Sequence, residues 1–408
     1  MDAFHYPLPE DRIAKFPLPQ RDQSKLLQYR RGELSDWRFA DLPRLLPKNS
    51  LLVMNNTKVV PARLIFYKPT GARIELMCLG PAERYATLET LLAERGTARL
   101  QAMIGNAKKW KAGQPLTLEH PQGLRLQVEK TSATGGVYEV RLTWQPEHWS
   151  LAQVLELLGQ TPLPPYLNRE PVAEDNLTYQ TVYAERAGSV AAPTAGLHFT
   201  PSVFLQLTMR GVSVANLTLH VGAGTFKPVD ENDPRKHEMH SERIEVSRQT
   251  ITQLYENLGK IIVVGTTSMR TLESLYWYAV TLMQTPEGLP EVNIPQLMPY
   301  QKSNPAELPS PQDALAFLLN RMAQTDAQQV SGQTQLMIMP GYQFKLCNGL
   351  ITNFHQPRST LLLLVSAFIG EAWKDVYQHA LANGYRFLSY GDSSLLWREG
   401  NAPPEGHP

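Results

Sequence analysis

A short run of β-branched residues is the feature that most limits how this chain can fold. Ile261 to Val264 is apolar at every position, which indicates a buried strand. The stretch Gly265-Thr266-Thr267-Ser268 ends that strand, and a helix is expected to begin near Met269. Because short strands and helical segments alternate from residue 180 onward, the sequence predicts a large mixed α/β domain.

A second pattern interrupts this domain. Apolar and polar residues alternate over 124–129 and again over 138–142, on either side of the pair Gly135-Gly136. Alternation with a period of two around a glycine turn is typical of a β-hairpin, so we expect a small inserted antiparallel β-barrel. The predicted division is 1–66 and 150–408 for the large domain, 67–149 for the barrel and 282–333 for a proline-rich excursion from the core.

The composition limits the kind of protein that these domains can build. Among 408 residues, 39 lysines and arginines balance 38 acidic residues, which excludes an overall basic nucleic-acid coat and an acidic tail but not a local basic patch. Its two cysteines, Cys78 and Cys347, are too few for a disulfide framework or a cysteine-rich zinc site. The longest apolar run, 361–369, reads as a buried helix and is far shorter than the roughly 20 residues of a membrane span. Since residues 1–15 lack a signal-like apolar segment, we expect a soluble cytoplasmic protein without a membrane partner.

Four predicted loops combine glycine, hydroxyl and histidine residues and are candidates for chemistry. They span residues 188–200, 217–226, 265–270 and 350–360. Small residues let the backbone approach a ligand closely, and histidine can exchange a proton near neutral pH. Each loop also has a simpler interpretation, as a tight turn, a β-bulge or a helix cap.

Three further features leave alternatives open. Arg270 in the first turn of a helix opposes the helix dipole, which predicts an anionic partner, either Glu273 or a ligand. His237 and His240 could ligate a metal, but they are spaced i, i+3 rather than the i, i+4 of zinc-binding helices, and no metal site is expected. Asp392 lies at a glycine turn and is either an acid or a turn-forming aspartate.

The combination and order of these segments resemble one protein family. The matched stretches are NNTKVVPARL at 55–64, TPLPPY at 161–166, SVAAPTAGLHFT at 189–200, LHVGAGTF at 219–226, MHSE at 239–242, VGTTSMRTLES at 264–274, LITNFH at 350–355 and YRFLSYGD at 385–392. They resemble the S-adenosylmethionine:tRNA ribosyltransferase-isomerases of queuosine biosynthesis, and the resemblance covers nearly the whole chain. It implies the family's fold, a large mixed α/β domain with a small β-barrel insertion.

The resemblance implies an enzyme that uses S-adenosylmethionine as a ribosyl donor and co-substrate, with no further cofactor. The ribosyl group is transferred to 7-aminomethyl-7-deazaguanine at the wobble position of tRNA and isomerised, giving epoxyqueuosine with release of adenine and methionine. Such a reaction needs a base that removes a proton from the ribosyl 5′ carbon and a donor that assists the departing adenine. The implied partners are the modified tRNA and S-adenosylmethionine, and a monomer is expected.

The resemblance also implies which residues act. The catalytic candidates are the histidines inside the matched loops, His198, His220 and His355, and the sequence leaves open which is acid and which is base. The candidates for holding the methionine carboxylate are Thr266, Thr267 and Arg270, and those for reading a base edge are Asn55 and Asn56. The other expected substrate-binding residues are Thr194, Gly196, Gly222, Gly224, Asn353 and Asp392.

Several positions depart from the family's usual pattern. Gln335 stands where an aspartate is common, Gln356 stands where a leucine is common, and Arg243-Ile244 replaces an aromatic pair. Residues 103–109 differ from the usual basic, proline-containing form, and 282–333 lengthens the chain. These departures leave two alternatives to the family reaction: a paralogue that acts on another acceptor, and a non-catalytic protein that binds tRNA without releasing adenine.

Overall fold

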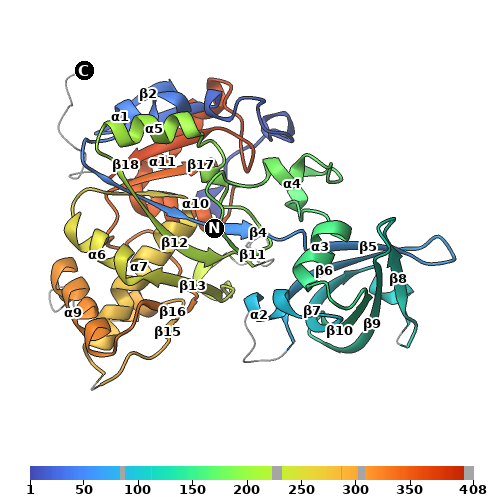
Figure 1. Ribbon diagram of the computed structural model, residues 1–408. Helices are drawn as coiled ribbons and strands as arrows, with labels where there is room; N and C mark the ends of the chain where they lie inside the picture. The colour runs from blue at the N-terminus through green and yellow to red at the C-terminus, as the bar shows by residue number, and fades with distance from the viewer. Residues whose placement is uncertain (83–87, 112, 223–231, 286, 302–307, 399–408) are drawn as a thin grey trace. The chain divides into compact units, whose positions relative to one another are not determined.

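The computed structural model describes residues 1–82, 88–111, 113–222, 232–285, 287–301 and 308–398. The chain forms two compact units, each described here by itself (Figure 1). The large unit comprises Met1–Thr57, Thr181–Ala184 and Pro193–Pro408, and the barrel unit comprises Lys58–Gln180 and Glu185–Ala192. The predicted fold class, a mixed α/β domain with an inserted β-barrel, is confirmed. The predicted domain limits at 66/67 and 149/150 stay predictions.

One mixed sheet of ten strands forms the centre of the large unit. Across the sheet the order is β15 (Val292–Ile294), β16 (Gln329–Thr334), β13 (Glu242–Ser247), β12 (Ser213–His220), β3 (Leu51–Asn55), β14 (Ile261–Val264), β17 (Gly349–Asn353), β18 (Ser393–Trp397), β1 (Lys25–Arg30) and β2 (Glu33–Arg38). Strands β12, β3, β14 and β17 are parallel, whereas β13 and β18 are antiparallel to their neighbours β12 and β17. The apolar run 261–264 is β14 in the middle of the sheet, as predicted, because a central strand is covered on both faces.

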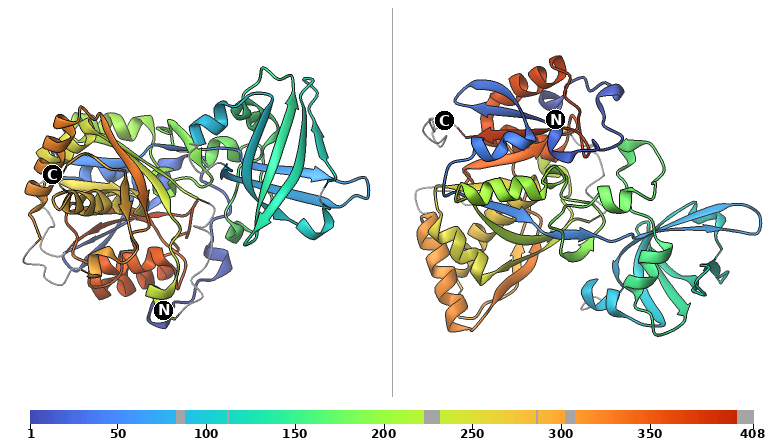
Figure 2. Two further views of the ribbon diagram at one scale, coloured as in Figure 1. Left: turned by 90° about the horizontal axis from the view of Figure 1, so that it is seen from below. Right: turned by 45° about the horizontal axis from the view of Figure 1, so that its top comes forward.

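Helices cover both faces of this sheet (Figure 2). On one face, α1 (Leu42–Leu45) and α5 (Pro201–Met209) share an apolar cluster with the strands, in which Leu207 packs with Leu52 and Ile262. The connection from β3 to β12 contains α5, and the connection from β14 to β17 contains α7 (Thr266–Leu282). These connections advance in opposite directions across the sheet, so right-handed crossovers place α5 and α7 on opposite faces.

The remaining helices of the large unit complete its layers. They are α6 (Arg248–Glu256), α8 (Met298–Gln301), α9 (Pro311–Gln324), α10 (Thr360–Ile369) and α11 (Trp373–Ala382). The apolar run 361–369 lies in α10 and is buried, as predicted, and the Ser359 hydroxyl caps it by accepting a hydrogen bond from the Leu362 N–H. Residues 282–333, predicted as an excursion, contain the edge strand β15, most of the adjacent strand β16, and α9, which packs on α6 and α7.

Six antiparallel strands form the barrel unit. Their order is β5 (Arg63–Tyr67), β6 (Arg73–Pro81), β7 (Thr97–Gly105), β10 (Val137–Gln145), β9 (Arg125–Thr134) and β8 (Leu116–Glu119). The predicted hairpin is β9–β10, with Leu142 opposite Val128. The first and last strands, β5 and β8, also contact each other, so the sheet is nearly closed. The unit also has α2 (Leu88–Ala93), α3 (Leu151–Leu158), α4 (Asp175–Thr178) and β11 (Arg186–Ser189), which pairs with β4 (Thr57–Val59).

Two local expectations are settled by these elements. The helix predicted near Met269 begins earlier, at Thr266, because Gly265 adopts a φ of +86° and serves as its N-cap. Residues 151–158, whose apolar positions follow a helical period between Ser150 and Gly159, form α3, and the Ser150 hydroxyl accepts a hydrogen bond from the Gln153 N–H. Within the described residues, no helix is both long and apolar enough to cross a membrane, and no group of three or more potential metal ligands occurs.

Candidate active site

The strand directions of the large unit bring most of the family-like segments to one edge of the sheet. Four parallel strands end there, at His220 of β12, Asn55 of β3, Val264 of β14 and Asn353 of β17. Strands β13 and β18 run the other way, so their first residues, Glu242 and Ser393, lie at the same edge. In sheets of this kind ligands bind beyond the carboxyl ends of parallel strands, so we call this edge the candidate site.

Asn55 and Asn56 join strands at this edge. The Asn55 side chain is fully buried; its Nδ2 donates to the Leu219 carbonyl at 2.9 Å, and its Oδ1 accepts from the N–H groups of Leu219 and Thr57, each at 3.1 Å. The Asn56 Oδ1 accepts a hydrogen bond from the Thr218 hydroxyl at 2.7 Å. Both amides are therefore engaged by the neighbouring strand β12, as structural links between β3 and β12.

His220 lies at the end of β12 beside the start of α7. Its Nδ1 is 3.0 Å from the Thr57 hydroxyl, and the ring is half-buried. Thr267, in the first turn of α7, has its hydroxyl 3.4 Å from the Asn55 Nδ2, and Thr266 before it is buried. Gly222 follows His220 with open space around its Cα, whereas Gly224 lies outside the described residues. The structure thus places His220 and the two threonines near one another.

A short 3₁₀ turn, η7 (Thr194–Gly196), brings the longest matched segment to the same edge. The Thr194 hydroxyl donates to the Asn353 Oδ1 at 2.8 Å, and the Asn353 Nδ2 is buried without a hydrogen-bond partner in the described part of the chain. A Cβ on Gly196 would lie 1.9 Å from the Tyr183 hydroxyl oxygen, so this position accepts glycine alone without rearrangement. The turn therefore holds an unsatisfied amide donor at the candidate site.

His198 follows this turn and is the most distinctive titratable group at the site. Its Nδ1 lies 2.9 Å from the Ser24 hydroxyl, whereas its Nε2 is buried and unpartnered among the described residues. Burial lowers the pKa of His198 to about 4; a hydrogen bond with the Arg21 backbone opposes this shift, and the nearby guanidinium groups of Arg386 and Arg21 add to it. At neutral pH the ring is therefore uncharged and has one nitrogen available to a ligand.

The side chains of His355 and Asp392 both form hydrogen bonds within the protein. The His355 Nε2 is 3.0 Å from the Thr352 hydroxyl, and burial lowers the pKa of His355 to about 3. The Asp392 carboxylate accepts hydrogen bonds from the backbone N–H groups of Lys25 at 2.9 Å and Arg386 at 2.7 Å. Of the two alternatives for Asp392, these contacts favour the turn-forming aspartate.

Arg270 forms an ion pair with Glu242, an acid that the sequence analysis did not name as its partner. Its Nη1 donates to the buried carboxylate of Glu242, its Nε donates to the Leu336 carbonyl at 3.1 Å, and its Nη2 is buried without a partner in the described residues. The prediction that Glu273 is the partner of Arg270 is therefore wrong. That carboxylate instead accepts hydrogen bonds from the Tyr342 hydroxyl at 2.8 Å and from the backbone N–H groups of residues 345–347.

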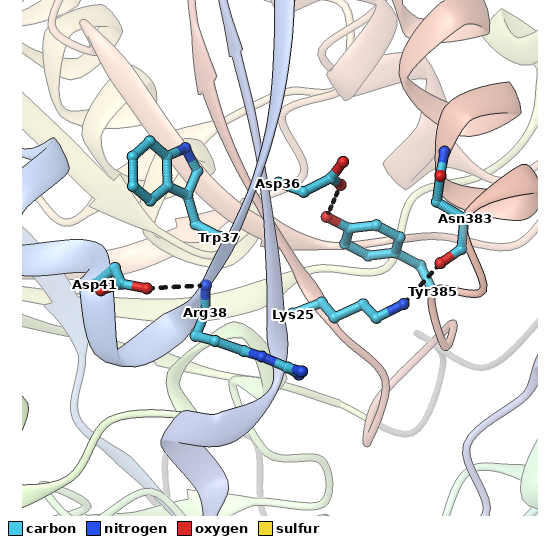
Figure 3. A pocket seen from close by; sticks show the side chains of 7 residues that line it. All are labelled: Lys25, Asp36, Trp37, Arg38, Asp41, Asn383 and Tyr385. Atoms are coloured by element: carbon cyan, nitrogen blue, oxygen red, sulfur yellow. Dashed lines mark hydrogen bonds between the residues drawn. The ribbon is translucent and has the colours of Figure 1, made fainter.

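A cavity of about 420 Å³ lies beside β1 and β2 (Figure 3). The Asp36 carboxylate accepts a hydrogen bond from the Tyr385 hydroxyl and lies 3.0 Å from the His379 Nε2. The Lys25 ammonium donates to the Asn383 carbonyl at 2.6 Å. These polar groups already form hydrogen bonds to one another or to the backbone, so this cavity is not the candidate active site.

The structure adds residues that the sequence analysis missed. Ser24 positions His198, and the Ser393 hydroxyl, opposite Asn353 in the sheet, is buried without a hydrogen-bond partner among the described residues. Ser24 lies outside the glycine-rich loops, and its contact with a distant histidine has no local signature. Ser393 follows the glycine turn at Asp392, but nothing local shows that it lies opposite Asn353. Glu242 is the exception, because it belongs to the matched MHSE segment, and that match was a sequence signal for its part at the site.

Comparison with known proteins gives the family. A family model described as queuosine biosynthesis protein matches residues 1–396. The chain belongs to this queuosine biosynthesis family. Two relatives in the family are named S-adenosylmethionine:tRNA ribosyltransferase-isomerase. The one from Xanthomonas oryzae is 39% identical over 402 residues, covering 97% of this chain and 96% of that protein. The one from Polynucleobacter asymbioticus is 39% identical over 415 residues, covering 99% of each.

A solved structure is also similar to this family member. It is the S-adenosylmethionine tRNA ribosyltransferase from Thermotoga maritima, which is 27% identical, with a TM-score of 0.44 over 96% of this chain and 99% of that chain. The family resemblance seen in the sequence is thus confirmed by the family model and by relatives that match over nearly their full length.

Proposed function

We propose that this chain transfers and isomerises the ribosyl group of S-adenosylmethionine onto 7-aminomethyl-7-deazaguanine at the tRNA wobble position. The products are epoxyqueuosine-tRNA, adenine and methionine. The chain is an enzyme of the S-adenosylmethionine:tRNA ribosyltransferase-isomerase class, and the family match over residues 1–396 is the observation that carries this assignment. The finer expectations, a monomer that acts in the cytoplasm, stay predictions.

His198 is our choice for the base that removes the proton from the ribosyl 5′ carbon. If its Nδ1–H donates to the Ser24 hydroxyl, the Nε2 keeps a free lone pair, and no described residue competes for it. A pKa of about 4 keeps the ring unprotonated but makes it a weak base. A substrate anion that neutralises Arg21 or Arg386 would raise this pKa and strengthen the base.

The start of α7 and Asn353 supply donors for the substrate. The first N–H groups of a long helix favour an anion, so Thr266 and Thr267 are the proposed ligands of the methionine carboxylate. Arg270 is committed to Glu242 and offers at most its remaining Nη2 hydrogens. The Asn353 Nδ2, buried and unpartnered in the described part of the chain, is positioned to donate to a polar atom of the substrate.

Adenine release tests the function. The purified protein is incubated with S-adenosylmethionine and tRNA bearing the aminomethyl-deazaguanine, and adenine is followed by chromatography. We expect adenine only with the modified tRNA, together with an epoxyqueuosine nucleoside in the digest. If the protein binds S-adenosylmethionine but releases no adenine, the alternative of another acceptor takes its place. If it binds tRNA but not S-adenosylmethionine, the non-catalytic alternative does.

The variant His198→Asn tests the proposed role of His198 as the base. His198→Asn keeps a polar atom near the Ser24 hydroxyl but removes the Nε2, and we expect kcat to fall by about a hundredfold or more. The matched control is His379→Asn, which changes a histidine of α11 that contacts Asp36, outside the candidate site. A His198→Asn enzyme with the wild-type kcat would assign the base to another residue.

A further inference from the structure

Five lysines gather at one end of the barrel unit. They are Lys68, Lys108, Lys109, Lys111 and Lys130, which we call the basic cluster. Three separate segments supply them: the hairpin between β5 and β6, the turn around η5 (Ala107–Lys109), and β9 (Figure 1). The Lys68 ammonium donates to the Lys109 carbonyl at 2.7 Å, and the Lys130 ammonium donates to the Trp110 carbonyl at 2.6 Å. These bonds hold the hairpin and β9 against the same turn.

Two of the lysines have a structural role that accounts for them. Lys68 and Lys130 satisfy backbone carbonyls at the end of the turn, and the Lys130 ammonium also lies 5.4 Å from the centre of the Trp110 ring. Trp110 is buried and donates its indole N–H to the Gln114 carbonyl at 2.6 Å. The turn is therefore anchored on several sides.

The other three lysines have no structural explanation. Lys108, Lys109 and Lys111 are exposed, and their ammonium groups have neither a hydrogen-bond acceptor nor a carboxylate partner among the described residues. On the neighbouring strand, Glu75 is already bound to Arg63 at 2.6 Å and lies 3.6 Å from Arg73. The turn thus presents uncompensated positive charge, although the whole chain has a formal charge of only +1.

An exposed aromatic residue precedes Lys68 in the sequence. Tyr67, the last residue of β5, is 66% exposed and immediately precedes Lys68, whose ammonium contacts the lysine turn. Surfaces that bind nucleic acid combine cations, which contact phosphates, with aromatic rings, on which bases stack. Tyrosine also occurs at membrane and protein interfaces, so the choice of RNA rests on the proposed function, whose substrate is a tRNA, and the binding experiment includes lipid vesicles.

We propose that the basic cluster and Tyr67 form a docking surface for the phosphate backbone of RNA, used to hold the tRNA substrate outside its reacting nucleotide. The identification of that RNA as tRNA rests on the proposed function. Lys108, Lys109 and Lys111 contact phosphates, Tyr67 stacks on a base, and Lys68 and Lys130 keep the turn in place.

Salt-dependent binding tests the surface. Binding of fluorescent tRNA is measured by anisotropy between 50 and 200 mM salt for wild type, K108Q/K109Q and the control R125Q/R141Q. The control removes the same charge from exposed positions on the barrel strands β9 and β10. Each lost phosphate contact lowers the slope of log affinity against log salt by about 0.9, so we expect a decrease of about 2 in K108Q/K109Q and none in the control. The fourfold rise in salt then weakens this variant about tenfold less than wild type.

Tyr67→Ala separates stacking from charge. It should weaken tRNA binding about tenfold at every salt concentration and leave the slope unchanged, because stacking releases no counterions. The charge-preserving variant K108R/K109R should bind like wild type. An unchanged affinity and slope in K108Q/K109Q would overturn the proposal. So would unchanged tRNA binding combined with lost binding to vesicles of phosphatidylglycerol and phosphatidylcholine, since the surface would then be one for lipid.

The adenine assay distinguishes this inference from the proposed function. With saturating modified tRNA, K108Q/K109Q should keep the wild-type kcat while its KM for tRNA rises. If wild type releases no adenine, the proposed function fails, yet the binding comparison still decides whether the surface holds RNA. If wild type is active and K108Q/K109Q has the wild-type KM, the function stands and the docking surface is refuted.

Discussion

Two buried histidines predict how the stability of this protein responds to pH. The pKa of His198 is lowered to about 4 and that of His355 to about 3, both from an ordinary value of 6.5, mainly because burial disfavours the charged ring. As the pH falls below 6.5, the unfolded chain binds protons at these positions while the folded protein does not. Their contribution to stability is therefore complete above pH 6.5 and is lost progressively toward pH 4 for His198 and pH 3 for His355.

The size of the loss follows from the linkage relation. Each histidine changes the free energy of unfolding by about 1.4 kcal/mol per pH unit below 6.5, so at pH 5 each costs about 2 kcal/mol and the two together about 4 kcal/mol. Typical proteins have a total stability of about 5–15 kcal/mol, so the effect is readily measured. The carboxyl group of Asp36, whose pKa is lowered, loses its contribution largely below pH 5.

Urea unfolding followed by circular dichroism at pH 7.5, 6.5, 5.5 and 5.0 measures this loss. His198→Asn and His355→Gln each keep a polar atom near the hydroxyl that the ring contacts, Ser24 or Thr352. Each variant should lose about 2 kcal/mol less than wild type between pH 7.5 and 5. The exposed His148 of the barrel unit provides the control His148→Asn, expected to follow wild type. Identical pH profiles for wild type and His198→Asn would refute the argument that folding holds this ring neutral.

Three further substitutions test buried contacts of the large unit. Glu273→Ala leaves the N–H groups of residues 345–347 without their acceptor, and we expect the free energy of unfolding in urea to fall by about 3 kcal/mol or more. Gly196→Ala places a Cβ 1.9 Å from the Tyr183 hydroxyl oxygen and should abolish adenine release while circular dichroism stays native; adding Tyr183→Phe should restore part of the activity. Arg270→Met removes the ion pair of the buried Glu242 carboxylate and should cost about 3–5 kcal/mol of stability in urea, most of it recovered when Glu242→Met is added.

Matched variants control for the substitutions themselves. Gly80→Ala, at a position where a Cβ meets nothing within 4 Å, should change neither stability nor activity, in contrast to Gly196→Ala. Glu129→Ala, at an exposed position of β9, should leave stability within about 0.5 kcal/mol of wild type. Wild-type stability in Glu273→Ala, or no recovery in the Arg270→Met/Glu242→Met pair, would show that these contacts do not stabilise the large unit.

The sequence by itself determined the elements whose cause is local. Strand β14 follows from four consecutive β-branched residues, the hairpin β9–β10 from alternation around Gly135-Gly136, and α3 from a serine cap and a terminal glycine. Each depends on side chains within a few residues of one another, where propensity and periodicity act directly. The family could also be recognised from the sequence, because long matched stretches can be identified without knowing how they are arranged in space.

The tertiary structure alone decided which polar groups at the site are free. Asn55 was predicted to bind a ligand, yet β12 satisfies its amide, and Arg270 is largely engaged by Glu242. His198, Asn353 and Arg270, the last at its Nη2, each keep an unpartnered atom among the described residues. The partners concerned lie far apart in the chain; the Ser24–His198 contact alone spans 174 residues. Whether a buried polar group is satisfied depends on which segments the strand order brings to the same edge, and that order is a property of the folded sheet.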